Sequence, residues 1–200
     1  MAEAMTRATF TREEADSRRQ SLIDACAARL AVDGVAGATV RAICAEAGVS
    51  PGLLRHYFEG IDDLIGATYQ AVGERVATAL AAAVEEAGEG PRTRLSAYVV
   101  ASFRPPIADP ALLATWIAFW SLVKSDPGIA TLHGDIYSGY RDGIEGLLAE
   151  NGVAPADRRM KAVAITALVD GLWLELCLAP DAFTADEAAE MAERWLDALL

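Results

Sequence analysis

The sequence predicts an all-α protein of about nine helices, with an N-terminal three-helix helix-turn-helix domain at residues 1–61 and a second helical domain at residues 62–200. Three observations support this fold class. Apolar side chains recur at the three- to four-residue spacing of one helical face. Residues that cap, start or stop helices separate these segments. No stretch competes as a strand by alternating apolar and polar side chains.

The first long helix is predicted to begin at Ser17, because Ser17 and Gln20 have the spacing of a capping box. Its apolar stripe consists of five side chains at helical spacing: Leu22, Ile23, Cys26, Ala27 and Leu30. Gly34 is expected to end this helix, because glycine readily adopts the left-handed conformation that often follows a helix.

Two short helices joined by a tight turn are predicted next. Thr39 caps the first of them, and Gly48 permits the turn that follows. Ser50 caps the second, which has Pro51 at its first position and ends near Phe58. Two short helices around a glycine-containing turn form a helix-turn-helix.

Long helices are predicted for the rest of the chain. A fourth helix runs from about Asp62 to Ala87, and the Gly-Glu-Gly-Pro segment at residues 88–91 is the best linker candidate. Four further helices are bounded by prolines, an aspartate cap and an Asn-Gly stop, near 92–103, 110–125, 128–150 and 155–179. A second capping box at Thr184 opens the last helix, which continues to the end of the sequence.

The composition narrows the class of protein. Hydrophobic residues make up 53% of the chain, but no uncharged apolar run reaches the roughly 18–20 residues of a membrane span. The first 19 residues lack the apolar core of a secretory signal. The three cysteines have no zinc-site spacing and are expected to be reduced and buried: Cys26, Cys44 and Cys177. We therefore expect a cytoplasmic protein without a metal or other cofactor.

The negative charge is unevenly distributed. The net charge is −12, but residues 1–60 carry seven arginines and eight acidic residues, so the other −11 lies in residues 61–200. A near-neutral N-terminal domain can present arginines on one face, and an acidic body is expected to point away from phosphate. The same numbers are also compatible with an acidic surface that has no role in nucleic-acid binding.

The helix-turn-helix contains residues suited to contacts with DNA. Backbone N–H groups at the start of its second helix attract phosphate, and Gly52 lets a DNA backbone approach. Arg55 and His56 lie where a base edge of the major groove would be, although a phosphate contact is an alternative for Arg55. The predicted DNA-binding residues are Thr39, Arg41, Ser50, Pro51, Gly52, Arg55, His56 and Tyr57.

A family resemblance rests on this motif. The run A-G-V-S-x-G-x-L-x-x-Y-F at residues 47–58 resembles the TetR/AcrR family of repressors, and its His-Tyr-Phe ending resembles the choline and betaine regulator branch, BetI. Residues 18–25, 116–120 and 168–174 also resemble this branch. The resemblance implies that the second short helix recognises DNA, that the fourth helix transmits the ligand state, and that the last two helices form a homodimer. Such a dimer is expected to bind a near-palindromic duplex.

Two residues depart from the family pattern. Ile61 stands where the family usually has a phosphate-contacting lysine, so phosphate affinity there must rest on backbone N–H groups or be absent. Arg55 replaces a tyrosine found in many members. Because arginine can bind guanine through two hydrogen bonds, we expect an operator different from that of relatives.

Aromatic residues of the C-terminal domain indicate a candidate ligand pocket. Trp116 and Trp120 are four residues apart and Tyr137 and Tyr140 three apart, so each pair shares a helical face. Asp170 lies in an otherwise apolar helix, where a carboxylate is costly without a partner. Aromatic faces with one carboxylate suit a quaternary ammonium ion, in agreement with the resemblance. The predicted ligand-binding residues are Trp116, Phe119, Trp120, Tyr137, Tyr140, Asp170 and Trp173.

Other interpretations remain open at this point. The aromatic pairs also fit a plain core, and Asp170 also fits a contact with a neighbouring helix or a partner subunit. The sequence lacks the catalytic and nucleotide-binding motifs that would indicate an enzyme. We therefore predict a repressor released by a small molecule, choline or a related quaternary amine. The alternatives are a regulator of a different small apolar ligand and a helical interaction protein without DNA binding.

Overall fold

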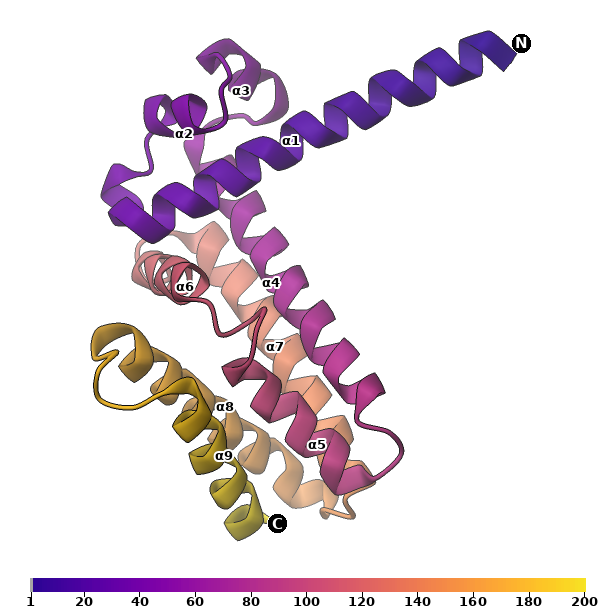
Figure 1. Cartoon of the computed structure of the whole chain (residues 1–200), viewed down its shortest axis with the longest axis vertical. Helices are drawn as coiled ribbons and strands as arrows, with labels where there is room; N and C mark the ends of the chain where they lie inside the picture. Colours follow the sequence, from indigo (N-terminus) through magenta and orange to yellow (C-terminus); the bar gives the residue numbers. More distant parts are fainter. Residues whose placement is uncertain (1) are drawn as a thin grey trace.

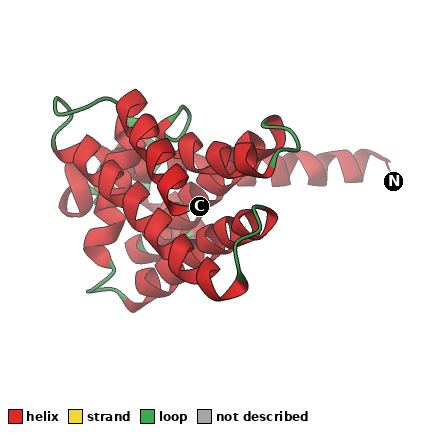
Figure 2. Cartoon of the chain, turned by 90° about the horizontal axis from the view of Figure 1, so that it is seen from below, coloured by secondary structure: helices red, strands yellow, loops and turns green. Residues whose placement is uncertain are grey.

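The computed structural model describes the backbone of residues 2–200 and the side chains of residues 15–200, so side-chain expectations for residues 1–14 lie outside the described residues. Within this part the protein consists of helices and connecting loops, without a strand (Figures 1 and 2), which confirms the all-α prediction. The elements are α1 (Ala2–Gly37), α2 (Val40–Glu46), α3 (Pro51–Tyr57), α4 (Ile61–Glu86), α5 (Pro91–Val100), the 3₁₀ helix η1 (Ala101–Phe103), α6 (Pro110–Leu122), α7 (Pro127–Glu150), α8 (Pro155–Leu178) and α9 (Ala185–Leu199). No helix of the described range is long and apolar enough to cross a membrane.

Side-chain caps set the start of four helices at positions that the sequence predicted. The hydroxyl of Thr39 accepts the N–H of Ala42 at 3.3 Å, and that of Ser50 accepts the N–H of Leu53 at 3.3 Å. Asp109 caps α6 in the same way. Thr184 forms the predicted reciprocal capping box at α9. These caps satisfy backbone groups that have no partner within the helix.

The prediction for the start of the first helix was wrong. Helix α1 begins at Ala2 and passes through Ser17 without forming a cap there. The segment before Ser17 has no proline or glycine to stop a helix and is rich in good helix formers, so the backbone continues as a helix through the expected boundary. The C-terminal prediction holds, because Gly34 leaves the helical conformation with φ of 62° before a last short turn.

The predicted helix at 92–103 is two elements in the structure. Helix α5 ends at Val100, and residues 101–103 form the tighter 3₁₀ turn η1. A 3₁₀ turn at a helix end is common where the chain cannot continue, and two prolines follow at 105 and 106. The predicted linker lies in the loop between α4 and α5, where Gly88 has φ of 79°.

The helices form two groups (Figure 1). Helices α1–α3 lie at one end, and α4 and α7 run side by side from there to the region of α5, α8 and α9. Helix α6 packs against α1, and the N-terminal part of α1 extends away from the body (Figure 2). Buried residues of both groups belong to one hydrophobic core. The boundary between residues 61 and 62 lies in the first turn of α4 and stays a prediction.

The cysteines differ in burial. All three are free thiols. Cys26 and Cys44 are buried, as expected, whereas Cys177 is only half-buried. Burial raises the pKa of the Cys26 thiol to about 11, so this thiol is protonated and unreactive at neutral pH.

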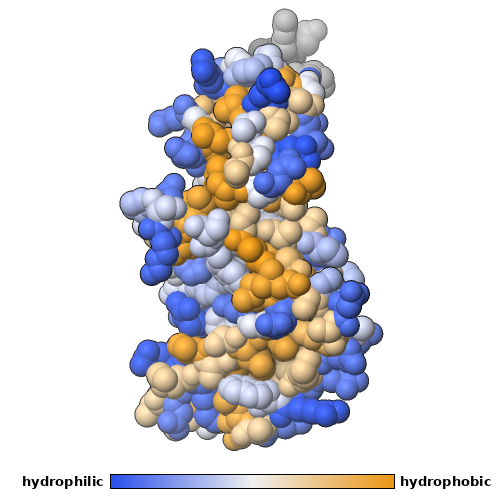
Figure 3. Space-filling model, turned by 90° about the vertical axis from the view of Figure 1, so that its left-hand side faces the viewer, coloured by the Kyte–Doolittle hydropathy of each residue, from blue (hydrophilic) through white to orange (hydrophobic). Residues whose placement is uncertain are grey.

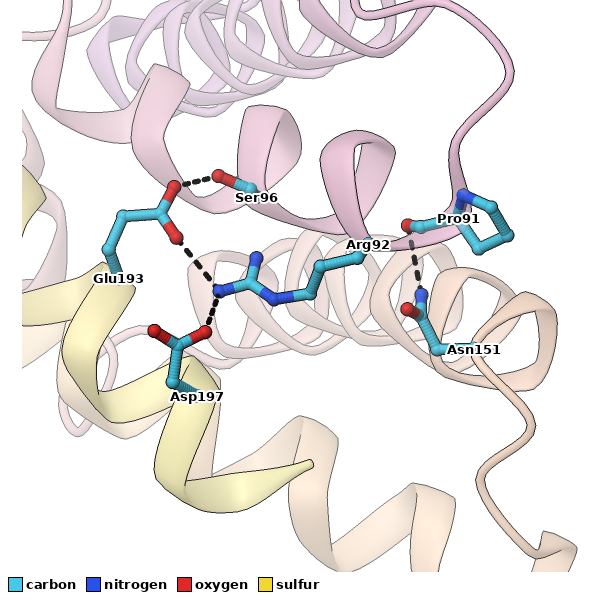
Figure 4. Close-up of polar contacts among 6 residues, drawn as sticks. All are labelled: Pro91, Arg92, Ser96, Asn151, Glu193 and Asp197. Atoms are coloured by element: carbon cyan, nitrogen blue, oxygen red, sulfur yellow. Dashed lines mark hydrogen bonds and ion pairs between the residues drawn. The ribbon is translucent and has the colours of Figure 1, made fainter.

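A polar clamp attaches α9 to α5 (Figure 4). The Arg92 guanidinium donates to Glu193 at 2.9 Å and to Asp197 at 2.6 Å, and the Ser96 hydroxyl also donates to Glu193. At the end of α7, the Asn151 amide donates to the carbonyl oxygen of Pro91 at 2.9 Å. Helix α5 is thereby held between α7 and α9, which connects the last helix to the centre of the domain.

Helices α8 and α9 leave apolar side chains in contact with solvent. Figure 3 shows apolar residues spread over the lower half of the side on which α8 and α9 lie. Among the described residues, the exposed large apolar side chains of these helices and the chain end are Met160, Val163, Leu174, Leu178, Met191, Trp195 and Leu200. Trp195 is 40% exposed and Leu178 67% exposed, which is costly in water unless another surface covers them.

Candidate functional site

The first candidate site is the helix-turn-helix of α2 and α3. Ile43, Leu54 and Phe58 are buried and join these helices to α1 and α4. Gly48, with φ of 64°, makes the turn, a conformation that other residues adopt at a cost. Because the apolar sides of α2 and α3 face the core, their polar sides face solvent.

Seven of the eight predicted DNA-binding residues are exposed, namely Thr39, Arg41, Ser50, Pro51, Gly52, Arg55 and His56. Tyr57 is half-buried, and its ring meets His56 edge-on with centroids 5.1 Å apart. Among the described residues, neither Arg41 nor Arg55 forms an ion pair. Both guanidinium groups are therefore available to a negatively charged partner.

The start of α4 has a different character. Ile61, which replaces the family's lysine, is half-buried and packs against the core. Asp62 and Asp63 occupy the first helical turn, and the Asp63 carboxylate accepts the N–H of Glu59 at 3.0 Å. Two carboxylates repel phosphate at this position. Of the two possibilities left open by the sequence, this arrangement favours the absence of a phosphate contact.

One residue of this surface was not predicted from the sequence. The guanidinium of Arg19, on α1, lies 5.1 Å from the centre of the Phe58 ring. This cation–π contact holds an exposed arginine beside the end of α3. No local pattern indicates it, because Arg19 and Phe58 are far apart in the sequence.

The second candidate site is a cavity of about 610 Å³ that is partly open to solvent and bounded by α4, α5, η1, α6, α7 and α8. Five of the seven residues predicted to bind ligand line it, namely Trp116, Tyr137, Tyr140, Asp170 and Trp173. They come from α6, α7 and α8. The structure thus brings together side chains up to 57 positions apart in the sequence.

A hydrogen-bond network is centred on Tyr137. Its hydroxyl donates to the Asp170 carboxylate at 3.0 Å and accepts the indole N–H of Trp116 at 3.2 Å. Trp120 donates to the same hydroxyl at 3.1 Å. Trp173 donates instead to the carbonyl oxygen of Ser102 at 2.8 Å, and its ring meets Trp116 edge-on at 5.8 Å. The aromatic rings are therefore fixed in orientation as well as packed.

Asp170 is half-buried and has little compensation for its partial loss of solvent. Within the described residues it accepts one hydrogen bond, from Tyr137, and forms no ion pair. Desolvation raises the pKa of Asp170 to about 6, although the Tyr137 hydroxyl and the charge of Arg141 act in the opposite direction. Burial and the Asp170 charge also raise the pKa of Tyr137, so its hydroxyl stays protonated as a donor. At neutral pH the cavity contains a mostly ionised, weakly compensated carboxylate.

Phe119 and Trp120 lie outside the cavity lining. Phe119 is fully buried and stacks on Tyr69 of α4 with ring centres 4.2 Å apart. Trp120 is half-buried and reaches the site through its bond to Tyr137. Tyr69 shares a hydrogen bond of 2.9 Å with His133, which lies against Tyr137 at 4.2 Å between ring centres. These residues form a layer of packed rings behind the cavity wall.

Several lining residues were not predicted from the sequence. Tyr98 and Ser102, from α5 and η1, form part of the wall. Gly73 of α4 also lines the cavity, and a Cβ there would lie 2.9 Å from Ile136, so glycine permits close packing of α4 on α7. The tyrosine at 98 was a detectable aromatic signal, but it has no aromatic partner at helical spacing on α5.

The charged residues that line the cavity all have one sign. Its described lining includes the carboxylates of Glu74, Asp135 and Asp170 and no lysine, arginine or histidine. A larger hollow of about 1380 Å³ lies between α1, α4, α5 and α6, but its lining has no aromatic ring. The smaller cavity therefore combines aromatic rings with carboxylates, which the larger hollow does not.

Two family models match this chain. Residues 22–68 match bacterial regulatory proteins of the tetR family, and residues 91–200 match the C-terminal part of BetI-type transcriptional repressors. The HTH-type transcriptional regulator BetI of Burkholderia thailandensis is 34% identical over 185 residues, which cover 92% of this chain and 93% of that protein. BetI 2 of Chromohalobacter salexigens is 37% identical over 189 residues, 92% of this chain and 88% of that protein.

Solved structures share the fold. A putative transcriptional regulator from Pseudomonas aeruginosa PAO1 superposes with a TM-score of 0.83 at 42% identity, covering 92% of this chain and 90% of that one. A putative transcriptional regulator from Saccharomonospora viridis, solved in complex with choline, has a TM-score of 0.77 at 19% identity, with coverages of 91% and 96%. At the latter identity the likeness concerns the fold alone.

Proposed function

Because the chain belongs to the TetR family of bacterial regulators and carries a BetI-type C-terminal domain, we propose that a small ammonium cation controls its binding to DNA. As a member of this family the protein is a DNA-binding transcriptional regulator and not an enzyme. The finer proposal is that choline or a related quaternary amine binds the cavity and releases the repressor from its operator in the cytoplasm.

One observation carries the proposal for the effector. Asp170 is a half-buried carboxylate that accepts one hydrogen bond and forms no ion pair in the described structure, and it lines the cavity together with Trp116 and Trp173. A buried charge is costly until an opposite charge approaches it, and indole faces attract a quaternary ammonium ion. The choline complex of the S. viridis protein supports the same ligand class on a shared fold.

Calorimetry with matched ligands tests this proposal. Choline is compared with 3,3-dimethylbutanol, which has the same shape without the charge. We expect choline to bind and the neutral alcohol to bind at least tenfold more weakly. Asp170→Asn is expected to remove this difference, whereas Glu175→Gln, at an exposed position on the same helix, keeps it. Equal affinity for the two ligands, or no binding of choline at millimolar concentration, contradicts the proposal.

For the DNA-binding surface we propose α3 as the recognition helix. Its exposed Arg55 and His56 are the proposed contacts to base edges, while Arg41 and the groups around Ser50 are proposed to contact phosphate. The carboxylates of Asp62 and Asp63 make a phosphate contact at the start of α4 unfavourable. Selection of bound duplexes from a random pool, with and without choline, gives the operator directly; enrichment of a near-palindrome that choline reduces is the expected result.

We propose a homodimer formed through α8 and α9. The exposed Leu178, Met191 and Trp195 support this interface, together with the partly buried leucines at 168, 172 and 176. Two such helices from each subunit complete a four-helix bundle. Sedimentation should give a dimer at micromolar concentration, and Trp195→Asp should shift it toward a monomer; a wild-type monomer contradicts this part.

For the coupling of ligand to DNA we propose two routes. Helix α4 joins the helix-turn-helix to the cavity wall, as the family resemblance implies. Helix α6 offers a second route, because Trp116 lines the cavity while the neighbouring Thr115 contacts α1. The Thr115 hydroxyl shares its proton between the carbonyl oxygen of Ala111 in its own helix, at 2.7 Å, and that of Ala27 on α1, at 3.2 Å. A shift of either helix changes the spacing of the two recognition helices from the roughly 34–36 Å that successive major grooves require.

A further inference from the structure

The hydroxyl of Tyr140 is an unused polar group in the wall of the cavity. Its oxygen is buried and has no hydrogen-bond partner among the described residues. The hydroxyl of Ser102, in the same wall, lies close enough to act on the pKa of Tyr140 in the lowering direction, but the two hydroxyls do not meet the geometry of a hydrogen bond. Leaving a buried hydroxyl unpaired is unfavourable, so native structures rarely keep one without a reason such as a ligand that completes it.

The position of the Tyr140 ring is well defined. Its backbone oxygen accepts the hydroxyl of Tyr98 at 3.2 Å, and the two rings pack with centres 5.3 Å apart. Tyr98 therefore uses its own hydroxyl within the protein, whereas Tyr140 does not. The unpaired hydroxyl is held in place before any ligand enters, which favours a specific hydrogen bond over a loose contact.

Tyr140 lies about one turn of α7 from Tyr137, the residue that bonds to Asp170 at the proposed cation site. Tyr137, which donates to Asp170, and Tyr140 are three residues apart on one face of α7, so their Cβ atoms are about 5–6 Å apart. A small molecule with its cation at Asp170 can therefore reach Tyr140 with a second polar group. The described part of the lining carries three carboxylates and no basic side chain, so a neutral group is favoured over an anionic one.

We propose that Tyr140 is a specificity-determining residue, whose hydroxyl bonds to a neutral oxygen, a hydroxyl or a carbonyl, carried by the effector about one helical turn from its cationic nitrogen. This inference rests on the proposed ammonium effector. It adds that charge and shape alone do not define the ligand, because the site selects ammonium ions that bear a neutral oxygen.

Two permanent cations of similar size test the inference. Choline carries the hydroxyl, and propyltrimethylammonium replaces it with a methyl group. The wild-type protein is expected to bind choline more tightly. Tyr140→Phe is expected to weaken choline binding about threefold to tenfold and to leave the affinity for propyltrimethylammonium within about twofold, so that the preference disappears. Glycine betaine, in which a carboxylate replaces the neutral oxygen, should bind the wild type at least tenfold more weakly than choline.

Tyr98→Phe is the matched control. It removes a hydroxyl that has a partner in the protein, so it should change the affinities for both cations by the same factor. Circular dichroism and melting temperature report whether each variant is folded, and Tyr140→Leu provides a second variant without the hydroxyl if Tyr140→Phe is unstable.

The outcomes separate the two proposals. If both cations bind and Tyr140→Phe leaves the choline preference intact, Ser102 or a water molecule satisfies the hydroxyl and the inference is wrong, while the ammonium effector stands. If Tyr140→Phe lowers the affinity for both cations equally, the side chain of Tyr140 contributes only packing, and the inference is wrong. If glycine betaine binds as tightly as choline, the proposal that the effector carries a neutral oxygen is wrong. If neither cation binds the wild type, the ammonium effector itself fails, and this inference fails with it.

Discussion

The helix-turn-helix and the aromatic cavity present their polar groups in opposite ways. On α2 and α3 the charged side chains of Arg41 and Arg55 are exposed, and neither forms an ion pair in the described structure. In the cavity, Tyr137, Trp116 and Trp173 are buried, and each makes a hydrogen bond within the protein. The first region keeps its binding groups free for a partner, whereas the second uses them to hold itself together.

This difference affects how each region responds to substitution. A side chain that is exposed and unpaired contributes to binding with little effect on folding. A buried, bonded side chain contributes to both, so a loss of ligand binding there has two possible causes. Measurements on the cavity therefore need a stability readout beside every affinity.

The largest expected effect is at the centre of the cavity. Trp173→Ala should lower the free energy of unfolding by about 3–5 kcal/mol, because Trp173 is only 6% exposed and its removal leaves a void in the core. It also leaves the carbonyl oxygen of Ser102 without its buried donor. Chemical denaturation followed by fluorescence gives the value. A variant as stable as the wild type would contradict this difference between the regions, because a substitution in the cavity would then change stability as little as one on the exposed helix-turn-helix.

The matching change on the DNA-facing surface should affect binding and not folding. Arg55→Ala is expected to weaken operator binding by about 1–3 kcal/mol and to relax the preference at one base in each half-site, if Arg55 contacts guanine through two hydrogen bonds. Its effect on stability should stay within about 0.5 kcal/mol. Arg194→Ala on α9, an exposed arginine of the other region, is the control. A uniform loss across operator sequences would identify Arg55 as a phosphate contact.

Lowering the pH should weaken choline binding, because Asp170 becomes protonated. Its pKa is raised to about 6, so the carboxylate becomes protonated as the pH falls through that value. Choline keeps its charge, and its affinity should fall about tenfold, or 1.4 kcal/mol, from the plateau at high pH to pH 5. The affinity of Asp170→Asn should be weak and nearly independent of pH. A wild-type affinity that does not change between pH 5 and 8 would contradict the role of Asp170.

Protonation of Asp170 should have the opposite effect on the ligand-free fold. Because burial raises the folded pKa above the ordinary value of 3.8, the ionised carboxylate opposes folding. The stabilising contribution of the protonated group is present below about pH 4 and is lost as the pH rises through about 6. The free energy of unfolding of wild type and Asp170→Asn should be compared over this pH range. The difference reports Asp170 alone, because both proteins keep the exposed carboxylates of Glu74 and Asp135 and keep His133, whose pKa is lowered by burial.

The smallest expected effect concerns the contact between the two regions. Thr115→Val keeps the shape of the side chain but removes the hydroxyl that bonds to Ala111 within α6 and to Ala27 on α1. Operator affinity without ligand should stay within about twofold, while the factor by which choline lowers that affinity should fall about twofold to fivefold. Gel-shift titrations with and without choline measure both. If this factor is unchanged, the contact of α6 with α1 does not transmit the effect of the ligand, and α4 is the remaining coupling route.

Much of the fold could be predicted because its signals are local. Thr39, Ser50, Asp109 and Thr184 cap helices where the sequence placed them, and each cap involves groups within three residues of one another. Ser17 shows the limit of such reasoning. It has the spacing of a cap, but the helix-forming residues before it extend α1, and a capping residue has no effect inside a continuous helix.

The candidate cavity was predicted less completely. Trp116, Tyr137, Asp170 and Trp173 were identified from helical spacing and from one acid in an apolar helix, and they do line one cavity. Phe119 shares the helix of Trp116 but turns to Tyr69 instead. Tyr98 and Ser102 were not predicted, because their part in the wall depends on where α5 and η1 pack.

The sequence by itself therefore determined the helices, the helix-turn-helix with its exposed arginines, and the residue types suited to a cationic ligand. Only the tertiary structure decided which hydroxyl pairs with Asp170, which ring faces the cavity and which hydroxyl is left without a partner. The physical reason is distance along the chain. A cap or a helical face depends on residues up to four positions apart, whereas a cavity is the space that remains between helices whose contacts, such as Tyr137 with Asp170, span 33 positions.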